Sequence, residues 1–127
     1  MKKFIKIVTD ILLVIVLVMA AVLYIPRLMG LKTYKVLSGS MEPEYHVGSV
    51  VYVEKSLIDD LEVGDVITFY INDNTVVTHR VVDKDDDTES FRTKGDANEI
   101  EDGGSVAYDK VVGKVVLNVP YLGYILR

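Results

Sequence analysis

The sequence predicts a mainly β protein, in which an N-terminal transmembrane helix is followed by a small curled β-sheet or partial barrel. Two patterns lead to this prediction: an uncharged apolar run over residues 11–25, and a two-residue hydrophobic alternation through much of the chain after residue 50. No helical periodicity of useful length follows residue 30. We therefore divide the 127 residues into a membrane anchor with its tether, residues 1–35, and a β-rich domain, residues 36–127.

The apolar run is long enough to cross a bilayer. Counted over residues 7–25 it has 19 residues, or roughly 28 Å of helix at about 1.5 Å per residue. A cleaved secretory signal is the competing interpretation, because three lysines precede the run and two alanines, at positions 20 and 21, lie within it. The run continues past those alanines, which favours an uncleaved single-pass anchor. Basic residues flank both ends equally, so charge alone does not set the orientation.

The charge of the chain changes sign after the anchor. Residues 1–35 contain six Lys/Arg and one acid, a net charge of +5, whereas residues 36–127 contain eight Lys/Arg and 18 acids, a net charge of −10. So acidic a domain would repel the phosphates of a nucleic acid, while the basic flanks of the helix suit anionic membrane lipids. The chain has no cysteine, which excludes thiol catalysis, disulfides and cysteine metal sites.

The segments with the alternation or composition of strands are Val50–Val53, Val66–Ile71, Thr75–Val82, Ser90–Lys94 and Val111–Val119. Asn72–Asn74 has the composition of a hairpin turn between the second and third of them. The acidic loop Asp83–Glu89 begins like a calcium loop, but Thr88 stands where that loop needs glycine and Lys94 where it needs glutamate. We predict no metal and no cofactor. The aromatic tail, residues 120–127, is too short to span and suits a membrane interface.

One hydroxyl stands out in the segment Leu37–Pro43. Ser40 follows Gly39, which leaves room for an approaching backbone, and Pro43 directs the segment away from a helix. Taken alone, the segment is an ordinary turn. A serine becomes a nucleophile only when a base can take its proton, so the interpretation depends on a partner elsewhere in the chain.

The chain offers two histidines as that partner. His46 lies in a loop and is expected to be solvated. Strand alternation places His79 on the same face as Val77 and Val81, where an imidazole must be satisfied or used. The second ring nitrogen of a catalytic histidine needs an acceptor, for which Asp96 and Asp102 are candidates that their spacing does not distinguish.

The sequence after residue 36 resembles the type I signal peptidases, in the branch found in the endoplasmic reticulum, archaea and some Gram-positive bacteria. The resemblance lies, in order along the chain, in Ser38-Gly39-Ser40-Met41-Glu42-Pro43 with Gly48, Gly64-Asp65-Val66-Ile67, Thr78-His79-Arg80-Val81, Thr93-Lys94-Gly95-Asp96-Ala97-Asn98 with Asp102, and Val112-Gly113-Lys114-Val115 before Pro120.

This resemblance implies a membrane-bound serine endopeptidase that removes N-terminal signal peptides from exported preproteins after small residues. It implies Ser40 as nucleophile, His79 as general base and Asp102 as the orienting acid. Asp96 would support them, and the Ser38 hydroxyl would help the Ser40 backbone N–H to form an oxyanion hole. The catalytic domain would face the extracytoplasmic or lumenal side, and partner subunits of a secretion machinery are compatible with this function.

Two departures from the family keep alternatives open. The common bacterial branch uses a lysine base, so Lys84 and Lys94 remain candidates for a Ser/Lys pair. Members of the branch often continue into a further membrane segment, whereas this sequence ends at Arg127. Two other functions remain to be weighed: a non-catalytic, membrane-anchored β-domain that binds exported chains, and an acidic metal-binding module.

Overall fold

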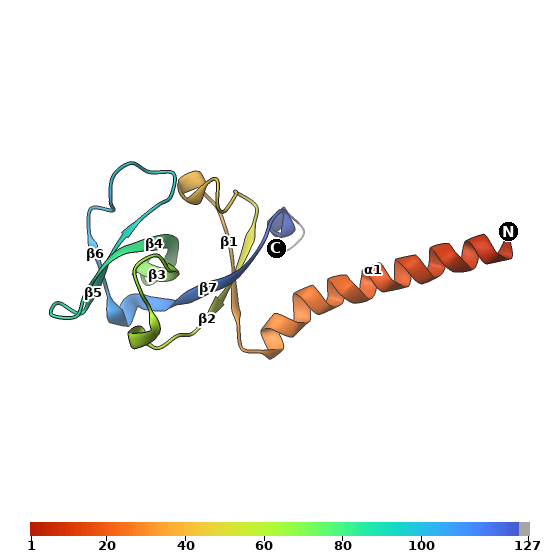
Figure 1. Cartoon of the computed structure of the whole chain (residues 1–127), viewed down its shortest axis with the longest axis horizontal. Helices are drawn as coiled ribbons and strands as arrows, with labels where there is room; N and C mark the ends of the chain where they lie inside the picture. Colours follow the sequence, from red (N-terminus) through yellow and green to blue (C-terminus); the bar gives the residue numbers. More distant parts are fainter. Residues whose placement is uncertain (125–127) are drawn as a thin grey trace. The chain divides into compact units, whose positions relative to one another are not determined.

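The computed structural model describes residues 1–124 (Figure 1). The chain divides into two compact units, Met1–Leu31 and the part that begins at Lys32. The first unit is a helix and the second an antiparallel sheet, so the predicted class, a helix followed by a mainly β domain, is confirmed.

The helix of the first unit, α1, spans Lys2–Leu28 and has 27 residues. It is longer than the predicted span at both ends. Pro26 lies inside it, near its C-terminal end. Arg27 follows in the last turn, where a cation interacts favourably with the helix dipole. Among the described residues, α1 is the helix long and apolar enough to cross a membrane.

The second unit contains one seven-stranded antiparallel sheet. Its strands are β1 (Lys32–Lys35), β2 (Val50–Glu54), β3 (Val66–Asn72), β4 (Thr75–Asp85), β5 (Ser90–Lys94), β6 (Ser105–Ala107) and β7 (Val111–Val119). They lie in the order β1-β2-β7-β3-β4-β5-β6. The sheet curls but does not close, so β1 and β6 are its two edges and the last strand, β7, lies near its centre (Figure 1).

The five predicted strands are all present, and the β3–β4 hairpin forms where it was expected. Strand β4 runs on to Asp85 and takes up the first part of the predicted acidic loop. Lys32–Lys35, predicted as a tether, instead pairs with β2 as a strand. The three-residue strand β6 was not predicted.

The described part of the C-terminal tail packs on the second unit. Leu122 is buried, and the Gly123 N–H donates to the Gly48 carbonyl at 2.7 Å. Residues 125–127, the remainder of the tail predicted to lie at an interface, fall outside the described residues.

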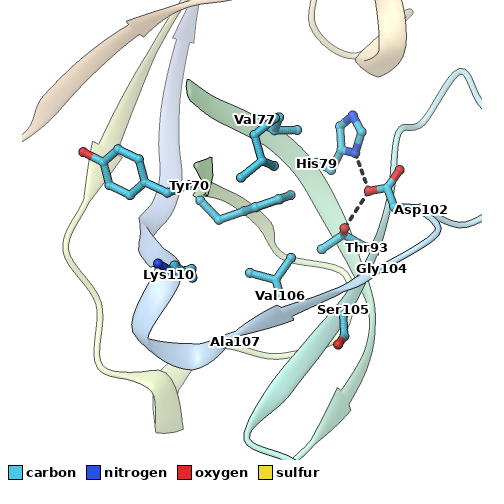
Figure 2. Close-up of a pocket in the computed structure, with 12 residues that line it drawn as sticks. Tyr70, Val77, His79, Thr93, Asp102, Gly104, Ser105, Val106, Ala107 and Lys110 are labelled. Atoms are coloured by element: carbon cyan, nitrogen blue, oxygen red, sulfur yellow. Dashed lines mark hydrogen bonds and ion pairs between the residues drawn. The ribbon is translucent and has the colours of Figure 1, made fainter. Parts of the chain in front are cut away.

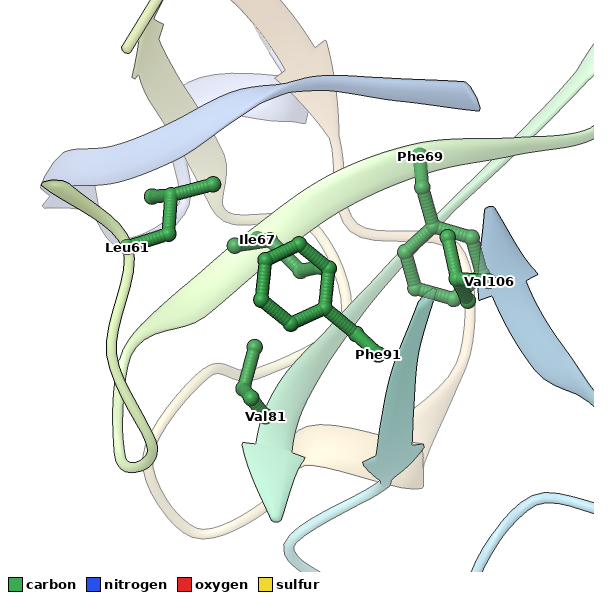
Figure 3. Packing of buried hydrophobic residues seen from close by; sticks show 6 residues of the cluster. All are labelled: Leu61, Ile67, Phe69, Val81, Phe91 and Val106. Atoms are coloured by element: carbon green, nitrogen blue, oxygen red, sulfur yellow. The ribbon is translucent and has the colours of Figure 1, made fainter. Parts of the chain in front are cut away.

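Two hydrophobic clusters hold the sheet. The first consists of Leu61, Ile67, Phe69, Val81, Phe91 and Val106 (Figure 3). The second consists of Met41, Val51, Val53, Val66 and Val115. Strands β3 and β4 contribute to the first cluster, and β2, β3 and β7 to the second, so both clusters are anchored on β3. The loop that carries Ser40 is fixed to the second cluster through Met41, which is buried.

Candidate active site

Ser40 lies in a single turn of 3-10 helix, Gly39–Met41, between β1 and β2. Ser38, which precedes the turn, has an extended backbone, and so does Glu42, which follows the turn. The extended backbone of Glu42 agrees with the prediction that Pro43 directs the segment away from a helix. Ser40 itself lies in one tight turn. Because Met41 is buried and Ser40 is half-exposed, the turn anchors one side chain in the core and presents the other to a groove.

The turn is attached to the segment after β5 by contacts with its backbone. The Ala97 N–H donates to the Ser40 carbonyl at 2.8 Å, and the Asp96 N–H lies 3.4 Å from the Met41 sulfur. A Cβ atom at Gly95 would stand 2.6 Å from the Ser40 carbonyl oxygen. Only glycine allows so close an approach at this position.

His79 comes from the middle of β4, where its Cα pairs with that of Ile67 on β3. It is 9% exposed, and its ring makes a T-shaped contact with the Phe69 ring, with centroids 6.4 Å apart and planes at 73°. Strand alternation predicted an inward imidazole, and the structure has one. The aromatic contact helps to hold the ring in one orientation.

The two ring nitrogens of His79 have different partners. Nδ1 lies 2.6 Å from Oδ2 of Asp102, and Nε2 lies 3.0 Å from Oγ of Ser40. A carboxylate can only accept a hydrogen bond, so Nδ1 carries the ring proton and donates a hydrogen bond to Asp102. Nε2 is then left with its lone pair and accepts the Ser40 O–H. This is the arrangement that a general base requires before a serine attacks a carbonyl carbon.

Asp102 belongs to the loop that follows β5 and is held by Thr93. The Thr93 hydroxyl donates to Oδ2 at 2.6 Å, and the Asp102 N–H donates to the Thr93 carbonyl at 2.9 Å (Figure 2). Oδ2 therefore receives two donors, one from His79 and one from Thr93.

Asp96, the other candidate acid, is paired with Arg80 instead. The Arg80 Nε and Nη2 atoms donate to its two oxygens, each at 2.8 Å, and Nη1 donates to the Gly64 carbonyl at 2.7 Å. The hydrogen bonds from Arg80 hold the pKa of Asp96 below its ordinary value, against the opposing effect of burial. The same bonds raise the pKa of Arg80. The geometry thus distinguishes two acids that their spacing in the sequence left equivalent.

The remaining candidates lie as follows. Ser38 Oγ is 3.1 Å from Ser40 Oγ. His46 is exposed, as expected, and its ring lies 3.5 Å from Glu42. The Lys84 ammonium donates to the carbonyls of Ile58 and Leu61, each at 3.0 Å, and the Lys94 ammonium donates to the Gly95 carbonyl at 3.1 Å. Both amines are thus engaged with backbone oxygens, while the Ser40 hydroxyl faces an imidazole.

Two hollows meet at His79. A groove of about 500 Å³ has both Ser40 and His79 in its wall, and the segments that line it are 34–38, 40–41, 45 and 75–79. We call it the serine groove. A second cavity, of about 540 Å³, is lined by residues that include His79, Thr93 and Asp102 (Figure 2). The walls of the serine groove are mostly apolar, and the Ser40 hydroxyl and the His79 imidazole are among its polar groups.

Thr93 and Arg80 lie within the motifs identified in the sequence, but no role was predicted for either. For Thr93 a signal was present, because two-residue alternation places it on the face of β5 that carries the buried Phe91. A hydroxyl on a buried face needs a partner. Nothing in the sequence indicated that the partner would be Asp102, since the intervening loop has no periodicity.

The family model described as "Signal peptidase, peptidase S26" matches residues 8–89. That stretch contains Ser40 and His79 and ends before Thr93, Asp96 and Asp102.

Curated relatives agree with the family match. Signal peptidase I W of Bacillus subtilis (strain 168) is 39% identical over 120 residues, covering 84% of this chain and 63% of the relative. The signal peptidase complex catalytic subunit SEC11 of Fusarium vanettenii is 35% identical over 101 residues, covering 71% of this chain and 59% of the relative. The human signal peptidase complex catalytic subunit SEC11C is 33% identical over 101 residues, covering 71% of this chain and 53% of the relative. The matched part is therefore between about half and two thirds of the length of these relatives.

Proposed function

The chain belongs to the signal peptidase family, peptidase S26, and from this membership we propose that it is a membrane-bound serine endopeptidase that removes N-terminal signal peptides from exported preproteins. The observation that carries the proposal is the hydrogen-bonded series Ser40–His79–Asp102, with Ser40 Oγ 3.0 Å from Nε2 and Nδ1 2.6 Å from the carboxylate. Its three members come from a turn, a strand and a loop of one folded unit.

In the first half of the reaction, Ser40 Oγ attacks the carbonyl carbon of the scissile bond while Nε2 of His79 takes the hydroxyl proton. The imidazolium that forms is stabilised by the Asp102 carboxylate on Nδ1. His79 then gives the proton to the leaving amine, which departs with the mature protein. The signal peptide remains as an acyl ester on Ser40.

In the second half, water replaces the amine. His79 takes a proton from the water as it attacks the ester carbonyl, and returns that proton to Ser40 Oγ when the ester breaks. Charge develops on the carbonyl oxygen in both halves. We assign its stabilisation to the Ser40 backbone N–H with help from the Ser38 hydroxyl, and the 3.1 Å separation of the two serine hydroxyls supports this assignment.

The serine groove is the proposed site for the residues that precede the scissile bond. Its length is bounded by the segment after β1 and by β4, and its apolar lining suits the small residues expected at the first and third positions before the cut. The anchor, α1, would keep the chain attached to the bilayer from which the preprotein emerges. We propose that the catalytic unit faces the extracytoplasmic or lumenal side.

Partner subunits form a separate part of the proposal. The SEC11 relatives are named catalytic subunits of a signal peptidase complex. We propose that the anchored chain carries the whole chemical apparatus for cleavage, and that partner subunits, where present, act on substrate delivery.

The deciding experiment is cleavage of a model preprotein by the full chain in detergent, followed by mass spectrometry. Wild type should release a fragment cut after a small residue, and Ser40→Ala and His79→Ala should each reduce cleavage by about 10³-fold or more without loss of the folded state. Lys84→Met should cleave like wild type, because its amine is engaged with Ile58 and Leu61. Full activity of Ser40→Ala would end the proposal, and loss of activity in Lys84→Met would favour a lysine base.

The pH dependence is a second readout of the same assay. Protonation of Nε2 removes the lone pair that accepts the serine proton. Cleavage should therefore fall when the solution is made acidic enough to protonate the imidazole. Binding of the preprotein without cleavage at any pH would instead support the non-catalytic β-domain.

A further inference from the structure

We propose that Thr93 is a positioning residue of the active site, which fixes the Asp102 carboxylate so that Asp102 can in turn orient His79. The inference rests on the proposed function, in which His79 is the general base, and extends it to a residue with no assigned role. Its basis is the convergence of two donors, the Thr93 hydroxyl and His79 Nδ1, on the same oxygen of Asp102, each at 2.6 Å (Figure 2).

The first step of the argument is that Asp102 needs to be held. It lies in the connection between β5 and β6, and its side chain is 28% exposed. A carboxylate on a partly solvated loop has several rotamers and can exchange its partners for water. A single hydrogen bond from His79 would not select one of these rotamers, because the imidazole itself depends on Asp102 for its orientation.

The second step is that Thr93 has the rigidity that Asp102 lacks. It is 1% exposed and lies in β5, where its Cα pairs with that of Val81 on β4. Val81 is buried in the same cluster as Phe91, so the backbone that carries the hydroxyl is fixed from both sides. A β-branched side chain also has a restricted χ1 angle, so the hydroxyl oxygen of Thr93 is held in a narrow range of positions.

The third step is that Thr93 contacts Asp102 twice. Its carbonyl accepts the Asp102 backbone N–H at 2.9 Å, and its hydroxyl donates to the carboxylate at 2.6 Å. The first contact sets where the loop returns to the strand, and the second sets the side-chain rotamer. Together these two contacts fix the Asp102 carboxylate relative to β4 and β5. They thereby also fix the hydrogen bond that the carboxylate accepts from Nδ1 of His79.

The consequence for catalysis is specific. Removal of the hydroxyl leaves the backbone contact and the fold in place but frees the carboxylate to turn toward water. The fraction of molecules with the productive imidazole orientation then falls. Such a change lowers the rate of the chemical step and leaves substrate binding in the serine groove unaffected, because Thr93 is not part of that groove.

The test compares Thr93→Val with Thr93→Ser in the full chain in detergent. Thr93→Val replaces the hydroxyl by a methyl group of similar size and is expected to lower kcat by about tenfold or more with KM unchanged. Thr93→Ser keeps the hydroxyl and should retain most of the wild-type kcat. Ser90→Ala is the matched control: it removes a hydroxyl from the same strand, bonded there to Thr88, and should cleave like wild type.

A second measurement does not depend on cleavage. In protein labelled with ¹⁵N-histidine, the Nδ1–H signal of His79 is identified by its loss in His79→Gln. It should exchange slowly with water in wild type, Thr93→Ser and Ser90→Ala, and should shift and exchange faster in Thr93→Val. An unchanged signal in Thr93→Val overturns the inference, as does an unprotected signal in wild type.

The two readouts separate this inference from the proposed function. A wild-type enzyme that cleaves, together with Thr93→Val of full kcat, refutes the role of Thr93 and leaves the peptidase standing. A wild-type chain that never cleaves refutes the peptidase, and the histidine signal then decides whether Thr93 still holds the Asp102–His79 pair.

Discussion

The imidazole of His79 has a defined partner on each side. Asp102 binds Nδ1, Ser40 binds Nε2, and the Phe69 ring makes a T-shaped contact with the imidazole at 6.4 Å between centroids. Two of these contacts are directional hydrogen bonds and one is a packing contact. The tautomer follows from the hydrogen bonds alone, since a carboxylate cannot donate.

We expect Asp102→Asn to act through that tautomer. The amide nitrogen introduced by this change can donate to Nδ1, which moves the ring proton to Nε2 and removes the acceptor that Ser40 needs. By comparison with Ser-His-Asp enzymes, kcat should fall by about 10³- to 10⁴-fold, with little change in Tm. Both quantities can be measured in the preprotein assay and by thermal unfolding.

The matched control for Asp102→Asn is Glu101→Gln, one residue earlier in the same loop. Glu101 forms an exposed ion pair with Arg92 at 3.3 Å, and its neutralisation should leave kcat unchanged. If Asp102→Asn retained wild-type kcat, Asp102 would have no part in orienting His79.

Asp96 is expected to affect stability rather than chemistry. Its pKa lies below the ordinary value of 3.8, chiefly because Arg80 donates hydrogen bonds to the ionised form. A carboxyl group whose pKa is lower in the folded than in the unfolded state stabilises the fold at pH values above the unfolded pKa. That contribution declines as the pH falls through the lower, folded value.

Asp96→Asn should therefore lower the free energy of unfolding by about 1–3 kcal/mol at neutral pH. The difference in Tm between wild type and this variant should shrink as the pH falls below about 4, toward the lower pKa of the folded state. Thermal unfolding across this range measures it. A difference that stayed constant with pH would mean that the ionised Asp96–Arg80 pair does not contribute.

The sequence could predict an inward-facing His79, because strand alternation is a local pattern. The Ser40 segment taken alone is an ordinary turn, and its role as nucleophile is a prediction from the family resemblance. Residue spacing could not choose between Asp96 and Asp102. Both lie in a loop without periodicity, and only their tertiary contacts distinguish them. Arg80, next to His79 in sequence, donates hydrogen bonds to Asp96. Two neighbouring residues of one strand thus select two different acids.

Among the elements of the fold, the 3-10 turn of Ser40 and the loop after β5 act as one joined structure. The Ala97 N–H donates to the Ser40 carbonyl at 2.8 Å, and the Gly95 backbone lies close to the same carbonyl. The position of Ser40 is therefore set from two parts of the chain, about 55 residues apart.

Gly95→Ala should disturb that joint. The added Cβ atom would stand 2.6 Å from the Ser40 carbonyl oxygen, 2.7 Å from Asn98 Nδ2 and 3.1 Å from Ser40 Cβ. Backbone must move to relieve the first of these contacts, so Ser40 shifts relative to His79. We expect kcat to fall by about 10²-fold, as for other misplacements of about 1 Å, together with a lower Tm.

Gly103→Ala is the control for this change, because nothing lies within 4 Å of a Cβ atom at that position. It lies in the same loop and should leave both kcat and Tm near the wild-type values. Equal effects of Gly95→Ala and Gly103→Ala would mean that the loop responds to any added side chain, and not to the contact with Ser40.

The elements that sequence reasoning missed are the two sheet edges, and they share a physical cause. Strand β1 is Lys32-Thr33-Tyr34-Lys35, and β6 is Ser105-Val106-Ala107 after two glycines. Each has too few apolar residues to show alternation. Each is a strand because a longer neighbour, β2 or β5, supplies hydrogen-bonding partners, which is a tertiary effect.

At the scale of the whole molecule, the anchor and the sheet unit differ in the environment they require. The apolar side chains of α1 are largely exposed, as a helix that meets lipid requires, whereas those of the sheet unit fill two clusters. We therefore expect this chain to remain bound to membranes and to retain its N-terminal residues.

Alkaline carbonate extraction of membranes tests the anchor. Wild type should remain in the pellet, and mass spectrometry should find the N-terminal residues still attached. Leu13→Arg combined with Val16→Arg should release most of the protein, since each charge costs about 3 kcal/mol near the middle of a membrane span. Leu13→Val with Val16→Leu is the apolar control. Loss of the residues before about Ala21 would show instead that the helix is a cleaved signal.

The central place of β7 has a consequence for the order in which the protein is synthesised. This strand lies between β2 and β3, so it joins the half of the sheet next to Ser40 to the half that carries His79. A nascent chain that ends before β7 has only the contacts between the Ser40 turn and the loop after β5 to hold its hydroxyl near its imidazole. The sheet that fixes both groups is therefore complete only after Val119 has been synthesised.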